Sequence, residues 1–287
     1  MTEYTQVTAF CPGHISGYFR PYITGNSLTS GSIGAGVVID SGVVVTATTA
    51  EKTTVQILQQ GPSNSLILIA KDSPVIRDLL DDLHVTADVK TRCHLPLSSG
   101  YGLSAAALLA TVHAINALMD LRLSEEECAN RAHAIEVKHR TGLGDVSACQ
   151  GGGWVVRKAP GPQANIVRIY DDHTLYALTL RPISTSPVLS SPAKMSQILG
   201  SFPPDIPDNP IDIMRNSRRF AEASGLISDE IRKVLFACDA NDIPASMTML
   251  GEGVFAIGIA AGPVLSQFGT AYPLHPAKTG PYILECR

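Results

Sequence analysis

A glycine-rich segment at residues 96–106 combines the residue types that hold a phosphate group. Its sequence, PLSSGYGLSAA, leads from small residues and glycines directly into a stretch that is expected to be helical. The first backbone amides of a helix lack partners and lie at its positive end, so they form a ready site for an anion. Glycines let the backbone approach phosphate oxygens, and the Ser104 hydroxyl could bind a metal ion such as Mg²⁺. An ordinary loop before an Ala-rich helix is the alternative.

The same segment excludes two common nucleotide-binding motifs. It contains no Gly-Lys-Ser or Gly-Lys-Thr, so it is not a Walker loop. It also lacks the glycine spacing and the partner motifs of a protein kinase. Any nucleotide chemistry in this chain therefore uses another kind of loop.

Two acidic residues follow at a spacing that can bring them to one cavity. Glu136 lies near the end of an expected helix, and Asp145 comes after the turn Thr141-Gly142-Leu143-Gly144. The helix holds Glu136 at a fixed depth, and the turn can return Asp145 toward the same cavity. Asp145 would act there as a general base, or at least orient a hydroxyl group. The alternative is that Glu136 lies on a solvated helix face and Asp145 caps a turn, because charged side chains usually lie at the surface.

The glycine loop resembles the phosphate-binding motif of the GHMP kinases (galactokinase, homoserine kinase, mevalonate kinase and phosphomevalonate kinase), Pro-x3-Gly-Leu-Gly-Ser-Ser-Ala. Gly100 and Gly102 fall on the motif glycines, and Ser104 falls on its second serine. Tyr101 replaces the usual Leu, and Leu103 replaces the first serine. The resemblance implies a kinase that uses ATP and Mg²⁺. Its ATP phosphates would bind seven residues: Ser98, Ser99, Gly100, Tyr101, Gly102, Leu103 and Ser104.

The resemblance also gives roles to the two acids. It implies that Ser104 and Glu136 bind Mg²⁺ and that Asp145 lies beside the substrate hydroxyl, so these three are the expected catalytic residues. A loose phosphoryl-transfer transition state needs mainly positioning and charge neutralisation, so a modest base suffices. Residues 10–14, FCPGH, resemble the amino-terminal Pro-Gly-Lys motif with His14 in place of Lys. Residues 246–253, SMTMLGEG, resemble the third motif, which closes over nucleotide and substrate.

Four segments resemble one branch of this family, the archaeal pantoate kinases of coenzyme A biosynthesis. They are CPGHISGYF, GSIGAG, EVKHRTGLGDV and SMTMLGEGVFA, and they occur in the same order between about residues 8 and 257. The resemblance therefore covers most of the chain. It implies ATP-dependent phosphorylation of the primary hydroxyl of pantoate, which gives 4-phosphopantoate.

Pantoate requires a cation for its carboxylate and polar groups for its hydroxyls. Arg157, directly after GGGWVV, is a natural clamp for a carboxylate. His133 lies one helical turn before the first of the two acids, on the same face. Ser32 could bind a substrate oxygen, Ser30 is nearly as suitable, and Thr185 is a looser candidate. A structural role for His133, and an ion pair between Arg157 and a neighbouring acid, are the alternatives.

Composition limits the partners of this chain. Its 287 residues carry a net charge of −4 and no run of Lys and Arg, which argues against nucleic acid as a partner. The most apolar stretch, residues 102–121, is too polar to span a bilayer, and the first residues lack the pattern of a secretory signal. We therefore expect a cytoplasmic protein without a membrane partner. Because only 17% of the residues are charged, part of the surface is expected to be covered in a homodimer.

The expected elements favour an α+β fold of two lobes, because strands and helices interleave without a regular βαβ rhythm. Asp40-Ser41-Gly42 predicts a hairpin turn between GVVID and VVVTAT, and Ser124-Glu125-Glu126-Glu127 predicts a helix start. The Pro- and Gly-rich stretch at residues 158–163 predicts a boundary between domains at residues 1–160 and 161–287. The family resemblance implies a first lobe like the ribosomal protein S5 domain 2 fold and a ferredoxin-like second lobe, with the site between them.

Three other interpretations stay open. The chain could be a homoserine or mevalonate kinase of the same fold, although His14 in place of Lys weighs against mevalonate kinase. It could be a non-catalytic ATP-binding sensor, but such a protein is expected to lose either the base or the metal ligand. It could also be a structural protein whose glycine loops are simple turns.

Overall fold

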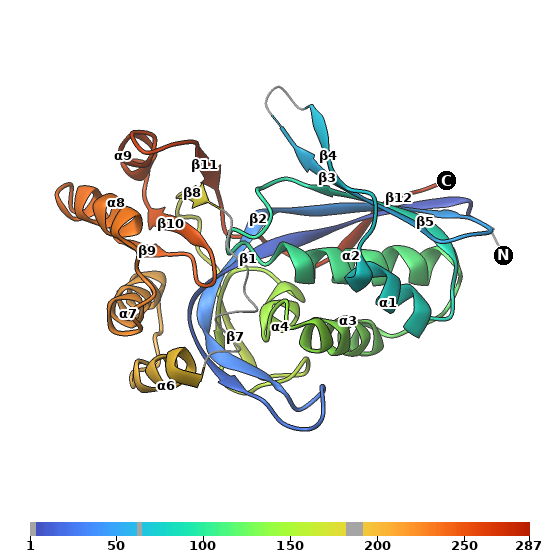
Figure 1. The fold of residues 1–287 in the computed structure, drawn as a ribbon, viewed down its shortest axis with the longest axis horizontal. Coiled ribbons are helices and arrows are strands. Elements are labelled where there is room, and N and C mark those ends of the chain that lie inside the picture. The colour runs from blue at the N-terminus through green and yellow to red at the C-terminus, as the bar shows by residue number, and fades with distance from the viewer. Residues whose placement is uncertain (1–3, 62–64, 182–191) are drawn as a thin grey trace.

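The first sheet is built around one long antiparallel pair of strands. β1 (Gln6–Tyr22) pairs with β2 (Gly31–Thr49) along nearly its whole length. The computed structural model describes residues 4–61, 65–181 and 192–287, and Figure 1 shows this pair crossing the width of the molecule. β2 contains two runs of Val and other β-branched residues, which favour extended backbone packed on both sides.

The predicted hairpin at Asp40-Ser41-Gly42 is wrong, because these residues lie inside β2. The register of the β1–β2 pair shifts at this point: Pro12 lies opposite Gly42, whereas Gly13 lies opposite Ile39. The extra residues of β2 form a bulge, and β1 continues beside both halves of the strand. A local turn signal is thus overruled because a partner strand pairs with the residues before and after it.

Six shorter strands complete the first sheet. β5 pairs antiparallel with β2, β3 pairs parallel with β5, and β4 forms the outer edge beside β3. β12 pairs with β1 at the opposite edge, while β6 pairs with β2 and β7 with β6. These strands are β3 (Thr54–Gln60), β4 (Leu66–Ala70), β5 (Ala87–Cys93), β6 (Trp154–Arg157), β7 (Ile166–Ile169) and β12 (Tyr282–Cys286).

Four helices lie on one face of this sheet (Figure 1). α2 (Leu103–Leu118) packs directly on β1 and β2, and α1 (Pro74–Asp82), α3 (Glu125–His139) and α4 (Asp145–Cys149) lie against α2. The predicted capping box before α3 is confirmed, because the Ser124 hydroxyl accepts from the Glu127 amide and the Glu127 carboxylate accepts from the Ser124 amide. Local capping therefore fixes where α3 begins.

A smaller antiparallel sheet, with strand order β11-β8-β10-β9, forms the second lobe. The helices that follow β8 in the described chain lie on this side of the molecule (Figure 1). The arrangement confirms the predicted α+β class. The strands are β8 (Leu175–Arg181), β9 (Ala245–Met247), β10 (Glu252–Ile257) and β11 (Ala271–Leu274); the helices are α6 (Pro192–Gly200), α7 (Pro210–Ala223), α8 (Asp229–Asp239) and α9 (Ala261–Leu265).

The division of the chain near residue 160 stays a prediction. The Pro- and Gly-rich stretch at residues 158–163 joins β6 to β7, and these two strands pair with each other. β12 also returns to the first sheet and pairs with β1. Two segments beyond residue 160 therefore belong to the first sheet.

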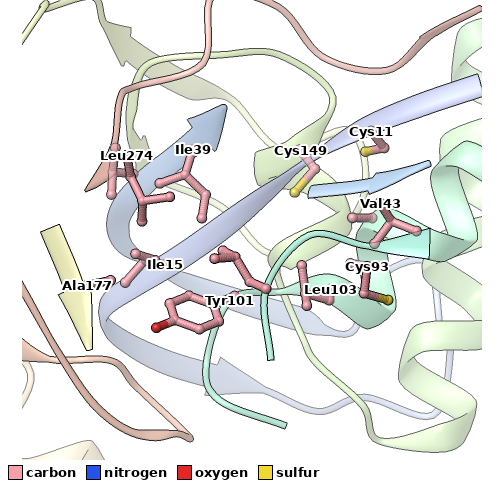
Figure 2. Packing of buried hydrophobic residues seen from close by; sticks show 14 of the residues in the cluster. Cys11, Ile15, Ile39, Val43, Cys93, Tyr101, Leu103, Cys149, Ala177 and Leu274 are labelled. Atoms are coloured by element: carbon pink, nitrogen blue, oxygen red, sulfur yellow. The ribbon is translucent and has the colours of Figure 1, made fainter. Parts of the chain in front are cut away.

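One apolar core joins the two sheets near the start of α2. Ile15 of β1 and Ile39 of β2 are buried in the same cluster as Ala177 of β8 and Leu274 of β11. Figure 2 shows Tyr101, which directly precedes α2, pointing into this region. The segment that leads into α2 is therefore held by residues from both sheets.

Candidate functional site

The amino end of α2 is left open by its own backbone. Its N-cap is Gly102, with φ 61°, and two nearby residues, Ser98 and Gly100, also have left-handed φ values of 57° and 80°. Glycine adopts this conformation without the steric cost that other residues bear. Within the described chain no side chain caps this helix end. The first amides of α2 are therefore available to an anionic ligand.

Tyr101 and Leu103, the two departures from the family motif, anchor the loop in the core. Both side chains are buried, and Figure 2 shows them among the residues that join the two sheets. The Tyr101 hydroxyl lies 2.9 Å from Thr179 Oγ1 on β8. These two positions therefore present their backbone to a ligand, while their side chains fix the loop.

A cavity of about 590 Å³ opens in front of this loop. All seven residues predicted to bind phosphate line it, together with the turn at residues 140–145. An apolar part of its wall comes from Ile57, Val75, Ile76 and Leu97. The cavity thus places a polar, amide-rich loop and an apolar surface in one space, which is the pattern of a small-molecule site.

The segment after β9 packs on the glycine loop, as the third family motif implies. The Thr248 hydroxyl donates to the Ser99 carbonyl at 3.1 Å, and the Met249 amide donates to the Ser16 carbonyl at 3.1 Å. Gly251 lies so close to the loop that an added β-carbon would be 2.3 Å from the Ser99 carbonyl group. The second lobe therefore contributes one wall of the site.

The turn after α3 brings the two predicted acids together at Gly142. A β-carbon at Gly142 would lie 2.4 Å from Glu136 Oε1 and 2.7 Å from Asp145 Oδ2. Asp145 is the first residue of α4 and lines the cavity, whereas Glu136 is buried behind the cavity wall. Glycine is thus required at position 142 because both carboxylates approach its backbone.

Asp145 belongs to a chain of three polar side chains. Nδ1 of His14 lies 2.6 Å from Oδ1 of Asp145, and Nη1 of Arg157 lies 3.3 Å from Nε2 of His14. His14 and Arg157 are both buried, and burial lowers the pKa of each. The predicted alternative, an ion pair between Arg157 and a neighbouring acid, does not occur directly among the described residues, because the His14 ring lies between Arg157 and Asp145.

Arg157 and Ser32 meet at Gly144. A β-carbon at Gly144 would lie 2.5 Å from Ser32 Oγ and 2.9 Å from Arg157 Nε. Nε and Nη2 of Arg157 have no hydrogen-bond partner among the described residues, although both are buried. Ser32 lines the cavity, whereas the hydroxyl of Ser30 already bonds to the backbone of Thr24. The structure therefore favours Ser32 over Ser30 as a contact for a ligand.

His133 and Glu136 form a buried pair in α3. Their Nδ1 and Oε2 atoms lie 3.3 Å apart, and His133 Nε2 donates to the Ser30 carbonyl at 2.9 Å. Burial raises the pKa of Glu136; burial alone would lower the pKa of His133, but Glu136 raises it. His133 thus contacts both Glu136 and the backbone just before β2, and it does not itself line the cavity.

The oxygen atoms near Gly142 suit a hard cation. Oε1 of Glu136 and Oδ2 of Asp145 face the same position at Gly142, while Oε2 of Glu136 lies 3.3 Å from Nδ1 of His133. No group of three or more His, Cys, Asp or Glu residues that could hold a metal occurs in the described chain. Mg²⁺ does not need such a group, since it takes one or two carboxylates and completes its shell with water and phosphate oxygens.

One predicted residue has no described position, and one residue near the site was not predicted. Thr185 lies outside the described residues. Arg168 of β7, which the sequence analysis did not identify, donates to the carbonyls of Gly152 and Ala148 at 2.9 and 3.0 Å and so supports the carboxyl end of α4. No local motif marks Arg168, because its partners are fixed only by the pairing of β6 with β7.

Comparison with known proteins identifies the family. The model of the GHMP kinases N terminal domain matches residues 68–153. The chain is 57% identical to the pantoate kinase of Methanospirillum hungatei over 98% of both chains. The chain belongs to the pantoate kinase family. A second member, the pantoate kinase of Methanocaldococcus jannaschii, is 30% identical over 86% of this chain and 91% of that protein.

Solved structures confirm the predicted two-lobed GHMP kinase fold. A phosphotransferase related to the coenzyme A biosynthesis pathway has a TM-score of 0.80 at 24% identity, covering 97% of this chain and 98% of that one. The homoserine kinase of Cytophaga hutchinsonii has a TM-score of 0.65 at 16% identity, covering 99% of both. Membership in the pantoate kinase family makes this chain a kinase that transfers phosphate to an alcohol group, with ATP as the implied donor.

Among the described residues, no helix combines the length and apolar character that crossing a membrane requires.

Gly251→Ala tests the contact between the closing segment and the glycine loop. The added methyl group would lie 2.3 Å from the Ser99 carbonyl group, which is backbone and cannot rotate away. We expect ATP to bind about tenfold more weakly, so that the rise in melting temperature with ATP becomes smaller. Gly25→Ala is the control, because nothing lies within 4 Å of its β-carbon position. An unchanged ATP effect in Gly251→Ala would contradict the prediction.

Proposed function

We propose that this kinase transfers the γ-phosphoryl group of ATP to the primary hydroxyl of pantoate, which gives 4-phosphopantoate. The family supports the reaction, since the relatives that identify it are pantoate kinases. The site supports the acceptor, since pantoate carries a carboxylate and hydroxyl groups.

The observation that carries the proposal is the unpaired edge of Arg157. Nε and Nη2 lie on the same edge of a guanidinium and donate in parallel, which matches the two oxygens of a carboxylate. Both atoms are buried and lack a hydrogen-bond partner in the described part of the chain, and such groups are costly unless a ligand satisfies them. Ser32 Oγ faces the same position at Gly144 and can bond to a hydroxyl of the acceptor.

ATP is proposed to lie with its phosphates on the open amino end of α2. The amides of residues 98–104 and the positive helix end stabilise the charge of the phosphates. The apolar wall at Ile57, Val75 and Leu97 suits the adenine ring. The γ-phosphate then lies between the loop and the turn that carries Asp145, which lines the same cavity.

Asp145 is proposed to act on the acceptor hydroxyl. Its Oδ1 atom bonds to His14, so Oδ2 remains to accept the proton or the hydrogen bond of the hydroxyl. As the oxygen attacks the γ-phosphorus, the bond to the β-phosphate oxygen breaks and ADP leaves. Because the transition state is loose, correct placement of the hydroxyl contributes more than the strength of the base.

Mg²⁺ is proposed to bind at Ser104 and Glu136. Ser104 lines the cavity in the first turn of α2, and Glu136 offers Oε1, the oxygen that faces Gly142 beside Asp145. The bound ion would neutralise charge on the β- and γ-phosphates. These positions are those that the family motif implies, and oxygen ligands of this kind suit Mg²⁺.

We further propose a cytoplasmic homodimer. The low charge of the chain and the exposed edge strand β4 support the dimer, since Leu66, Ile67, Leu68 and Ile69 are each 44–52% exposed. An apolar edge strand of this kind is unusual unless a partner covers it. The expected location follows from the small-molecule metabolism of the family.

ATP consumption with pantoate as the sole acceptor tests the proposed reaction. We expect turnover with pantoate and at least a hundredfold lower kcat/KM with homoserine or mevalonate. Homoserine carries an ammonium group in place of the C2 hydroxyl and lacks the two methyl groups, and the primary hydroxyl of mevalonate is one carbon farther from its carboxylate. A coupled ADP assay measures the three acceptors at equal concentration. Turnover of homoserine without turnover of pantoate would show that the acceptor is wrong while the kinase chemistry stands.

Asp145→Asn tests the role of the acid that lines the cavity. The amide keeps the size of the side chain and can accept from His14, but it cannot take a proton from the hydroxyl. We expect kcat to fall at least a hundredfold, with little change in the Kd for ATP. Asp78→Asn on α1, which removes a carboxylate paired with Lys138 and His139, is the control and should keep kcat within about twofold. Unchanged turnover in Asp145→Asn would remove this residue from the mechanism.

Arg157→Lys tests the carboxylate clamp. Lys retains the positive charge but cannot offer two parallel donors, so the KM for pantoate should rise at least tenfold while the KM for ATP stays within about threefold. Arg131→Lys, at a surface ion pair with Asp82, is the control. Steady-state kinetics with each substrate varied in turn separate the two constants. A rise confined to the KM for ATP would place Arg157 outside the acceptor site.

A further inference from the structure

His14 lies between the two groups that the proposed function assigns to opposite ends of the acceptor. It comes from β1, whereas Asp145 begins α4 and Arg157 ends β6, so three separate elements meet at one imidazole ring. The ring is fully buried and bonds to Asp145 at 2.6 Å on one side and to Arg157 at 3.3 Å on the other. Like Arg157 and Glu136, His14 is not among the described residues that line the cavity.

The partners of His14 determine which ring nitrogen carries the proton. A guanidinium group has donors only, so Nε2 of His14 must accept from Nη1 of Arg157. The proton of a neutral ring therefore lies on Nδ1, which donates to Oδ1 of Asp145. The hydrogen bonds run in one direction, from Arg157 through His14 to Asp145.

These two bonds leave one defined edge free on each partner. On Arg157, the bond from Nη1 leaves Nε and Nη2, the parallel donors that have no hydrogen-bond partner in the described chain. On Asp145, the bond to Oδ1 leaves Oδ2, which faces Gly142. The ring thus selects which atoms of each group remain for the acceptor.

The surrounding backbone fixes the ring in this position. The His14 amide donates to the Tyr101 carbonyl at 2.9 Å, which ties β1 to the glycine loop. A β-carbon at Gly36 of β2 would lie 2.7 Å from His14 Nε2, so the ring occupies space that only glycine leaves open. The position of His14 is therefore set by the same strands and loop that form the ATP side of the cavity.

We propose that His14 is a positioning residue that holds Asp145 and Arg157 at a fixed separation. The carboxylate and the reacting hydroxyl of the acceptor can then be bound at the same time. This inference rests on the proposed function, because it concerns how the same site positions its acceptor. It assigns His14 no direct contact with the acceptor. Loss of the bond to Arg157 should disturb binding of the acceptor carboxylate, and loss of the bond to Asp145 should disturb placement of the reacting hydroxyl.

Two substitutions separate these bonds. In His14→Asn the amide nitrogen takes the place of Nδ1, so the bond to Asp145 is kept and the bond to Arg157 is lost. We expect kcat within about threefold of the wild type and a KM for pantoate raised at least tenfold. In His14→Gln the amide oxygen takes the place of Nε2, so we expect the KM within about threefold and kcat lowered at least tenfold. His14→Leu should show both defects.

A merely structural role would give a different result. Equal effects of His14→Asn and His14→Gln on kcat and on KM would overturn the proposal, and so would wild-type kinetics in His14→Leu. His113→Asn on α2, a histidine that does not line the cavity, is the control and should leave both constants unchanged. Melting temperatures measured with and without ATP identify any variant that fails to fold.

A measurement on the unmodified protein tests the inference without a variant. ¹⁵N NMR of the histidine-labelled protein should show His14 with a protonated Nδ1 and an unprotonated Nε2. A proton on Nε2 would overturn the proposal, because Arg157 could then not donate to the ring. If the wild type does not turn over pantoate, the proposed function fails, and the state of the His14 ring still decides this inference separately.

Discussion

The open amino end of α2 is the constraint on which the rest of the site depends. Backbone amides can bind phosphate only if no side chain of the protein occupies them and if the loop before them does not move. Gly102 meets the first condition as the N-cap, and the burial of Tyr101 and Leu103 meets the second. The hydrogen bonds from Thr248 to Ser99 and from His14 to Tyr101 then hold the loop from both lobes. The proposed phosphate site is thus formed where the two sheets meet.

The parts of the fold that could be predicted from the sequence are those set by nearby residues. The capping box at Ser124 and the apolar run at residues 103–118 specify their helices locally, and both are confirmed. The turn signal at Asp40-Ser41-Gly42 fails because the local preference of three residues is weaker than pairing with a long strand on both sides. The return of β12 to β1 has no local signal, since it depends on residues more than 270 positions apart.

The residues of the candidate site divide in the same way, into those set by local motifs and those set by contacts between distant segments. The glycine loop and the acids Glu136 and Asp145 stand in short motifs, whose residue types and spacing predicted that they meet at one cavity. The loop and Asp145 line that cavity, whereas Glu136 lies behind its wall. The bond between His14 and Asp145 joins residues 131 positions apart, and no spacing rule connects them. Arg157 was predicted as a clamp from its residue type, but which of its edges remains unpaired could be known only from the position of the His14 ring. The role of Arg168 could not be predicted, because Arg168 contacts α4 through backbone carbonyl groups, which every residue possesses.

The pairing of β12 with β1 has a consequence for synthesis on the ribosome. β1 is synthesised long before β12, yet among the described residues its outer edge between Val7 and Phe10 pairs with residues 282–286. During translation that edge presents unsatisfied backbone groups to other nascent chains, and such edges template aggregation. Binding of a chaperone there would shorten the period of exposure, which otherwise lasts until the residues between β1 and β12 have been translated.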